Sequence, residues 1–128
     1  MKLLLDTCAF LWLNGDFENL PLRVRQICAD TENELYLSVL SAWEIALKQG
    51  VRRLTLPEPA DQYVPSRRKA NGIASLKLTE EAVLQVRKLP PVHNDPFDRM
   101  LICQAIVHGL TILTPDKQIA RYPVPVVW

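Results

Sequence analysis

The sequence of 128 residues is long enough for one domain with a buried core, and its formal net charge at pH 7 is +1. Hydrophobic residues make up 48% of the chain and charged residues 23%, a composition that excludes an intrinsically disordered protein. The near-neutral net charge does not indicate a nucleic-acid-binding protein, so such a function would need a local basic patch.

The first half of the chain alternates short apolar runs with helical patterns. In chain order it predicts a strand, two helices, a second strand and two further helices, at residues 3–5, 10–12, 22–29, 34–39, 41–49 and 60–69. Turn-forming residues separate them, among them Asn14-Gly15-Asp16 and Asn71-Gly72. Gly50 is the expected C-terminal cap of the helix over 41–49.

The second half continues this alternation. In chain order it predicts a strand, two helices, a strand, a short helix and a last strand, at residues 73–78, 79–88, 96–108, 110–113, 118–121 and 124–127. Gly109 ends the long helix, and Pro115 is expected to open the short one. Continuous apolar strands that alternate with helices indicate an α/β fold. We expect one domain over residues 1–128, with a parallel sheet covered by helices on both faces.

The three cysteines, Cys8, Cys28 and Cys103, are odd in number and lie far apart in apolar segments. This pattern excludes a disulfide framework and a CxxC zinc site, and it indicates a reducing compartment. The apolar start of the chain resembles a signal peptide, but Asp6 interrupts it and no small-x-small cleavage site follows. No run reaches the roughly 18 apolar residues of a membrane helix, so we expect a cytoplasmic protein with no membrane contact.

Four acidic residues lie at the expected junctions between strands and helices, namely Asp6, Glu44, Asp98 and Asp116. Each of them alone has a structural interpretation. Asp6 fits a helix N-cap, as does Thr7 beside it. Glu44 completes a capping box with Ser41, or pairs with Lys48 one turn later. Asp98 and Asp116 fit the first turns of helices that begin with a proline, and Asp95 is the expected N-cap before Asp98.

Their joint placement favours a different interpretation. Ligands of parallel α/β folds bind at the edge where the strands end, and Asp6, Glu44 and Asp116 all follow strands. Asp98 reaches the same edge from the N-terminus of its helix. Three or four carboxylates in one place repel each other unless they are protonated or bridged by a cation. A hard divalent ion prefers oxygen ligands, so the sequence predicts a magnesium or manganese site.

The motifs that carry these acids resemble those of a known family, and they read LLLDT, SAWEIALK, HNDPFDRMLICQA and LTILTPD. Their order is similar to the successive acidic motifs of the PIN-domain family, and most of all to the VapC-type ribonuclease toxins of toxin–antitoxin pairs. The resemblance runs from Leu3 to the closing VPVVW, although the segment 54–75 matches no motif. It implies a five-stranded sheet in the order 3-2-1-4-5. It also implies that Asp6, Glu44, Asp98 and Asp116 bind the metal, with Thr114 and Thr7 in support.

The resemblance further implies a function, namely Mg²⁺- or Mn²⁺-dependent hydrolysis of RNA phosphodiester bonds by one or two metal ions. It implies a small VapB-like antitoxin, whose C-terminal segment blocks the acidic groove, and a homodimer. Arg99 and Lys117 each follow a site acid, so contacts with RNA phosphates are expected there. His93 lies in a loop beside two prolines, where a structural role is the commoner one, and it is left out of the predicted site.

Two other functions remain open. A phosphoacceptor signalling domain also gathers acids around magnesium, but it needs paired acids after the first strand and a separate lysine after the last. Here Asp6 stands alone and Lys117 adjoins Asp116. A catalytically inert PIN-like module that only binds its partner is the other alternative. The four intact acids argue against it.

Overall fold

The computed structural model describes all residues from 1 to 128. Five parallel strands form one sheet in the order β3-β2-β1-β4-β5. Their bounds are β1 (Lys2–Leu5), β2 (Glu34–Ser38), β3 (Ile73–Leu76), β4 (Thr111–Leu113) and β5 (Val126–Val127). The order reverses at β1, which lies in the middle of the sheet. Ligands of parallel sheets bind at such a switch point, so a ligand site is expected at the carboxyl end of β1.

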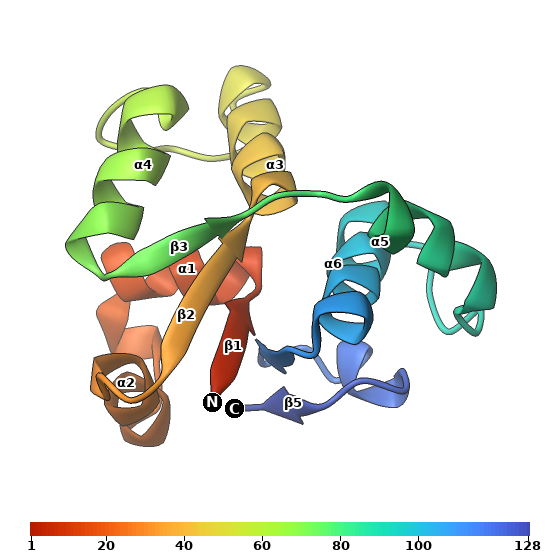
Figure 1. The fold of residues 1–128 in the computed structure, drawn as a ribbon. Coiled ribbons are helices and arrows are strands. Elements are labelled where there is room, and N and C mark those ends of the chain that lie inside the picture. Colours follow the sequence, from red (N-terminus) through yellow and green to blue (C-terminus); the bar gives the residue numbers. More distant parts are fainter.

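Six α-helices and three short 3-10 helices connect the strands. They are α1 (Thr7–Asn14), η1 (Phe17–Asn19), α2 (Leu22–Ala29), α3 (Val39–Gly50), α4 (Ala60–Ala70), α5 (Glu80–Leu84), η2 (Gln85–Lys88), α6 (Pro96–His108) and η3 (Ile119–Arg121). Residues of α1, α2 and α4 pack with Leu3 and Leu5 of β1, whereas residues of α6 pack with Leu4, and Figure 1 shows α5 and α6 on the opposite side of β1 from α2 and α4. The predicted α/β sheet with helices on both faces is therefore confirmed.

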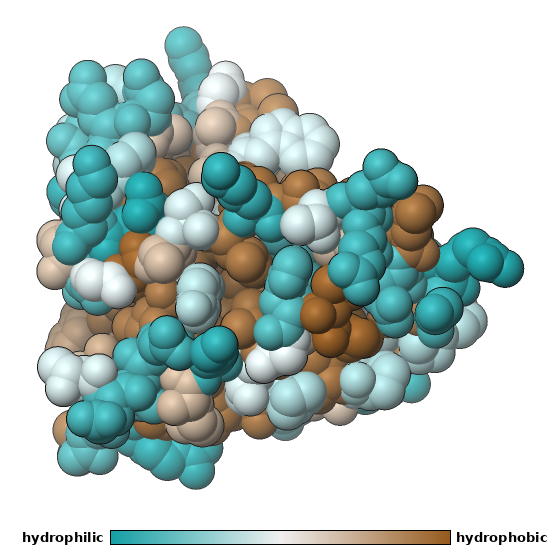
Figure 2. Space-filling model, in the orientation of Figure 1, coloured by the Kyte–Doolittle hydropathy of each residue, from teal (hydrophilic) through white to brown (hydrophobic).

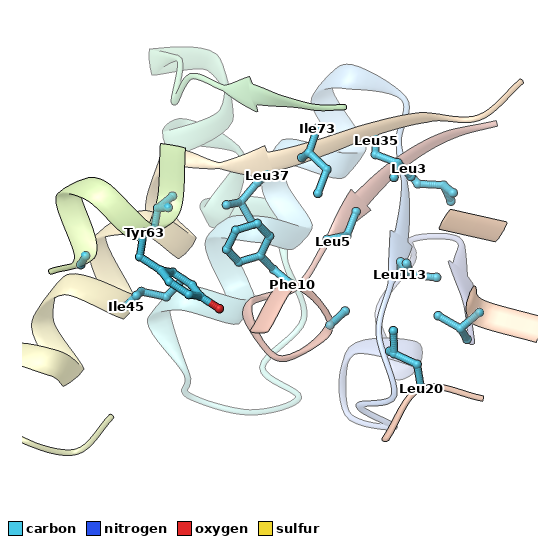
Figure 3. Close-up of a cluster of buried hydrophobic side chains, with 14 residues drawn as sticks. Leu3, Leu5, Phe10, Leu20, Leu35, Leu37, Ile45, Tyr63, Ile73 and Leu113 are labelled. Atoms are coloured by element: carbon cyan, nitrogen blue, oxygen red, sulfur yellow. The ribbon is translucent and has the colours of Figure 1, made fainter. Parts of the chain in front are cut away.

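The alternating side chains of β1 divide the hydrophobic core in two. Leu3 and Leu5 belong to a cluster that includes Phe10 of α1 and Tyr63 of α4, whose rings meet edge to face at 6.5 Å (Figure 3). Leu4 belongs to a second cluster, which is built mainly from α6 and β4. Because both faces of β1 are covered, all three leucines are fully buried. This burial explains the unbroken apolar run in the sequence, which ends only where the strand ends.

Hydrophilic residues cover much of the face seen in Figure 2, and hydrophobic residues are visible between them. Among the large hydrophobic side chains that stay exposed, Val39, Trp43, Leu47 and Val51 recur at every fourth position along α3. Ile45 of the same helix is fully buried in the core. None of the helices combines the length and the apolar composition that a membrane-spanning helix needs.

Helix α3 begins earlier than predicted. Ser38, the last residue of β2, is its N-cap, and the Ser38 Oγ accepts a hydrogen bond of 3.0 Å from the backbone N–H of Leu40. Ser41 therefore lies inside the helix, and the predicted capping box of Ser41 and Glu44 is wrong. Gly50 is also not a cap but the last helical residue, while Arg52 takes the left-handed conformation with φ of 59°.

The segment after β4 forms a turn where a helix start was predicted. The backbone N–H of Asp116 donates to Thr114 Oγ1 at 3.0 Å, and that of Gln118 donates to Asp116 Oδ1 at 2.8 Å. The 3-10 helix η3 begins only at Ile119, so the prediction that Pro115 opens a helix is wrong. The turn therefore holds Asp116 close to the end of β4, which is Leu113.

Candidate active site

A groove of about 370 Å³ lies where β1 and β4 end, and all four predicted acids line it. Its lining also includes Thr7, Cys8, Leu11, Trp12, Lys48 and Pro115. The acids come from four separate places in the chain: the end of β1, the second turn of α3, the first turn of α6 and the turn after β4. The fold thus brings together residues that lie up to 110 positions apart in the sequence.

Asp6 is the most deeply buried acid of the groove, with 6% of its surface exposed. It is the N-cap of α1, because its Oδ1 accepts a hydrogen bond of 2.7 Å from the backbone N–H of Ala9. Its Oδ2 accepts a hydrogen bond from the Thr114 hydroxyl. The pKa of Asp6 is raised to about 6, mainly by burial and to a smaller extent by the charges of Asp98 and Asp116, while these two hydrogen bonds act to lower it. The structural interpretation as a cap is therefore correct, but it leaves the carboxylate strained electrostatically.

Asp98 approaches the groove from the first turn of α6. Asp95 caps this helix, since its Oδ1 accepts from the backbone N–H groups of Phe97 and Asp98 at 2.9 and 3.2 Å. Burial raises the pKa of Asp98 to about 6, and the charges of Asp95 and Asp116 act in the same direction. The predicted helix start, with Asp95 outside and Asp98 inside, is confirmed.

His93 also belongs to this acidic cluster, which the sequence pattern does not predict. Its Nε2 lies 3.2 Å from Oδ2 of Asp98. Ligand atoms of His93, Asp98 and Asp116 all lie within 4.8 Å of one another. The only signal in the sequence was the position of His93 in the run HNDPFD, which also carries Asp95 and Asp98. Because His93 also lies in a loop beside two prolines, the sequence favours a structural role for it.

Glu44 is held by two side chains on its own side of the groove. The Thr7 hydroxyl donates to Oε1 at 2.6 Å, and Nζ of Lys48 binds Oε2 at 2.7 Å. The ion pair with Lys48 was one of the two structural interpretations, and it is confirmed. Thr7 also lies 3.0 Å from Oγ of Ser41, so it links the start of α1 to α3. Both carboxylate oxygens of Glu44 therefore have a fixed orientation toward the groove.

The family described as "PIN domain" matches residues 3–125 of the chain. The chain belongs to the PIN-domain family. The curated relatives include Ribonuclease VapC22 of Mycobacterium tuberculosis, which is 26% identical over 129 residues, or 98% of this chain and 97% of that protein. Ribonuclease VapC16 of the same organism is 41% identical over 54 residues, which cover 42% of this chain and 38% of that protein.

Solved structures with the same fold cover nearly the whole of this PIN domain. VapBC2 from Rickettsia felis, bound to a DNA fragment from its promoter, matches with a TM-score of 0.74 and 12% identity over 99% of this chain and 98% of that chain. DNA-bound VapBC from Salmonella typhimurium matches with a TM-score of 0.69 and 18% identity over 99% and 97%. The predicted family and the predicted strand order are both confirmed.

The groove of the PIN domain has the donor set of a hard divalent cation. Asp6, Asp98 and Asp116 supply carboxylate oxygens, the ligands that Mg²⁺ and Mn²⁺ prefer. Burial raises the pKa of both Asp6 and Asp98 to about 6, which means that burial disfavours their negative charges. A bound cation would compensate these charges, so the residues present fit such an ion.

Cys8 lines the same groove but lacks the properties of a reactive thiol. Burial and the charge of Asp6 raise its pKa to about 11. A thiol with a pKa raised in this way is protonated at pH 7, so Cys8 is not an activated nucleophile.

The two basic residues that follow site acids have different surroundings. Nη1 of Arg99 donates to the backbone oxygen of Pro90 and to the Tyr122 hydroxyl, both at 3.0 Å, and the guanidinium lies 5.9 Å from the centre of the Tyr122 ring. Lys117 is exposed in the turn after β4 and has no ion-pair partner within 4.0 Å. Arg99 therefore supports the loop before α6, whereas Lys117 faces solvent next to Asp116.

Proposed function

We propose that this PIN domain is a divalent-metal-dependent ribonuclease of the VapC type, which hydrolyses RNA phosphodiester bonds. The observation that carries the proposal is the convergence of Asp6, Glu44, Asp98 and Asp116 on one groove at the switch point of the sheet. The relatives VapC22 and VapC16, which are named ribonucleases, support the choice of RNA as the substrate.

Asp6, Asp98 and Asp116 would hold Mg²⁺ or Mn²⁺. When bound, the ion would activate a water molecule and neutralise charge on the phosphate and the leaving oxygen. Asp6 is oriented for this task by Ala9 and Thr114, so its carboxylate does not reorganise during the reaction. Asp116 is positioned by the turn over β4, through the hydrogen bond of its backbone N–H to Thr114.

Glu44 would orient the attacking water and accept its proton. Thr7 and Lys48 already bind its two oxygens, an arrangement that favours this role over the binding of a second ion. A general base contributes on the order of 100- to 10,000-fold to a rate. The effect of removing the Glu44 charge should fall in this range.

Lys117 and Arg99, which lie outside the lining of the groove, would bind phosphates of the RNA. Lys117 is exposed beside Asp116, and Arg99 has Nε and Nη2 without a protein acceptor. Contacts of this kind position the RNA and carry little sequence information. They also bring the anionic substrate to a groove that is itself acidic.

The proposal includes a protein partner, a VapB-like antitoxin that covers the groove, as well as a homodimer in the cytoplasm. Support comes from related structures that are described as VapBC and as a toxin–antitoxin complex from Klebsiella pneumoniae. The exposed apolar side chains of α3, from Val39 to Val51, offer a surface for such protein contacts. Three free cysteines fit a reducing compartment.

The decisive test is cleavage of RNA by the purified protein with and without a divalent ion. We expect cleavage with Mg²⁺ or Mn²⁺, none in excess EDTA, and none by an Asp6→Asn variant purified in the same way, which controls for contaminating nucleases. Undiminished cleavage in EDTA would contradict the metal-dependent reaction.

The same preparation separates the two alternative functions. Transfer of a phosphoryl group from a small phosphodonor to the protein, without RNA cleavage, would favour a phosphoacceptor domain. Calorimetric titration with Mn²⁺ that shows no binding would favour an inert module that only binds its partner.

A further inference from the structure

A chain of hydrogen bonds outside the acidic cluster ends on Asp98. It runs from Arg99 through Tyr122 and His93, with 3.0 Å between Arg99 Nη1 and the Tyr122 hydroxyl, 2.7 Å between that hydroxyl and His93 Nδ1, and 3.2 Å between His93 Nε2 and Asp98 Oδ2. The imidazole and phenol rings also pack against each other, with their centres 5.4 Å apart. Tyr122 is buried, with 4% of its surface exposed, so the chain is anchored in the core.

The donors around Tyr122 determine which nitrogen of His93 carries the proton. The backbone N–H of His93, at 3.2 Å, and Nη1 of Arg99 can only donate, and together they occupy both lone pairs of the Tyr122 oxygen. A proton on Nδ1 would bring a third donor to the same oxygen. The Tyr122 hydroxyl must therefore donate, and Nδ1 at 2.7 Å is a closer acceptor than the backbone oxygen of His93 at 3.3 Å.

It follows that Nε2 of His93 carries the proton and donates a hydrogen bond to the carboxylate of Asp98. A protonated nitrogen has no lone pair for a metal ion, so this tautomer makes His93 a hydrogen-bond donor rather than a ligand. Carboxylates that bind metals are commonly held by such outer partners, which fix their orientation.

We propose that His93 is a positioning residue, which holds the Asp98 carboxylate in place for the metal ion and is itself oriented by Tyr122. The inference rests on the proposed function, since it assumes that Asp98 binds the ion. The network connects two separate parts of the site. Tyr122 follows η3, only six residues after Asp116, whereas His93 and Arg99 flank the start of α6. The network therefore links the segment that follows Asp116 to the start of α6, which carries Asp98.

The competing possibility is that His93 binds the ion directly through Nε2, since a ring nitrogen of His93 lies within 4.8 Å of a carboxylate oxygen of Asp98 and of one of Asp116. Imidazole ligands favour later transition metals over Mg²⁺. Loss of a ligand would therefore change the preference between ions, whereas loss of a positioning residue weakens the binding of all ions by a similar factor.

The test compares His93→Ala with His93→Gln by calorimetric titration of Mn²⁺ and Mg²⁺ in the absence of RNA. The amide nitrogen of Gln can occupy about the place of Nε2 and donate to Asp98, whereas Ala has no donor. We expect His93→Ala to bind both ions roughly 10- to 100-fold more weakly, and His93→Gln to recover most of this loss. His108→Ala is the matched control, because His108 is exposed at the end of α6, and its metal affinity should not change.

Electron paramagnetic resonance of Mn²⁺ bound to the unsubstituted protein gives an independent result. We expect no strong coupling to an imidazole nitrogen. A strong nitrogen coupling that disappears in His93→Ala would overturn the proposal and make His93 a ligand. Unchanged Mn²⁺ affinity in a folded His93→Ala variant would overturn it as well. If the unsubstituted protein itself binds no Mn²⁺, the proposed function fails first, and the inference falls with it.

Discussion

Asp6 is a helix cap that also lines the acidic groove. Its two oxygens accept hydrogen bonds from Ala9 and Thr114, yet its pKa stays raised to about 6 because burial outweighs them. A buried carboxylate that is fully satisfied by the protein would not need a cation. Both oxygens of Asp6 have hydrogen-bond donors, but these donors do not offset the cost of burying its negative charge. Asp6 is therefore a candidate metal ligand.

Glu44→Gln separates the chemical role of Glu44 from its structural one. Gln keeps an oxygen for the Thr7 hydroxyl and loses the ion pair with Lys48, which lies one turn along the helix and is worth about 0.3–0.5 kcal/mol. The melting temperature should therefore fall by no more than about 2 °C, while RNA cleavage falls on the order of 100-fold or more. Thermal unfolding and a cleavage assay provide the two measurements.

Glu58→Gln is the matched control for Glu44→Gln. It removes another partly buried ion pair, that of Glu58 with Arg67 at 3.1 Å, but lies outside the groove. It should reproduce the small loss of stability with no loss of cleavage. Retained cleavage in Glu44→Gln would assign Glu44 to a purely structural role.

Asp95 and Asp98 should respond in opposite ways to the same substitution. Asn caps helices about as well as Asp, and Asp95 is exposed, so Asp95→Asn should change neither stability nor cleavage appreciably. Asp98→Asn should abolish cleavage and Mn²⁺ binding, and it should raise the melting temperature of the metal-free protein by removing a poorly compensated charge. The reverse pattern, with activity lost only in Asp95→Asn, would show that the wrong acid of this motif has been assigned to the site.

At the scale of elements, the site depends on three junctions where a strand ends. β1 leads into α1 through Asp6, β2 leads into α3 through Ser38, and β4 leads into the turn that holds Asp116. Gln104 of α6 ties one of these junctions, at Ser38, to the segment that follows β3. It is fully buried, and its side chain bonds the Ser38 hydroxyl at 2.6 Å and the backbone oxygen of Lys77 at 3.3 Å. The packing of α6 is therefore specified by polar contacts as well as by its apolar face.

Thr114→Val tests the turn after β4. Val has nearly the shape of Thr but lacks the hydroxyl that donates to Asp6 and accepts from the backbone of Asp116. Because Thr114 is 3% exposed, these lost hydrogen bonds should destabilise the protein by roughly 1–3 kcal/mol. Mn²⁺ affinity should also fall, since both acids lose their support.

Thr114→Ser keeps the hydroxyl and removes only a methyl group. Calorimetric titration should therefore show Mn²⁺ affinity close to that of the unsubstituted protein, with a stability loss of about 1 kcal/mol. Equal metal affinities for the Ser and Val variants would mean that the turn does not position the acids.

At the scale of the whole molecule, the groove makes stability depend on pH in a defined direction. The pKa values of Asp6 and Asp98 are raised from 3.8 to about 6 in the folded protein. Between about pH 4 and pH 6 the folded state therefore holds protons that the unfolded chain has already lost. Since the unfolded state binds fewer protons there, these two groups make the free energy of unfolding fall as the pH rises.

We therefore expect the double variant Asp6→Asn/Asp98→Asn to become more stable, relative to the unsubstituted protein, as the pH rises from about 4.5 to 7 in EDTA. Saturation with Mn²⁺ should make the unsubstituted protein the more stable of the two at pH 7. A ligand at 100 times its Kd stabilises the protein that binds it by about 2.7 kcal/mol, and the double variant is not expected to bind the ion. Melting curves at several pH values provide the measurement. A constant difference across this range would mean that neither carboxyl group has a raised pKa.

The sequence by itself determined the α/β class, the order of elements and the four acids of the groove. These properties follow from local patterns. A run such as Leu3 to Leu5 predicts a buried strand whatever surrounds it, and Asp95-Pro96 and Gly109 mark the ends of α6 through backbone preferences alone. The parallel sheet then places the residues that follow its strands at one edge, so acids distant in sequence could be expected to meet.

Only the tertiary structure decided how these acids are held. The hydrogen bond of Thr114 to Asp6, the burial of Gln104 and the contact of His93 with Tyr122 each join segments that local patterns treat separately. A helical wheel records one helix and not the strand end and loop that pack on it, so it does not predict the burial of Gln104. A loop histidine likewise has no periodicity to interpret, and its role depends on a tyrosine 29 residues away that the fold brings within 2.7 Å.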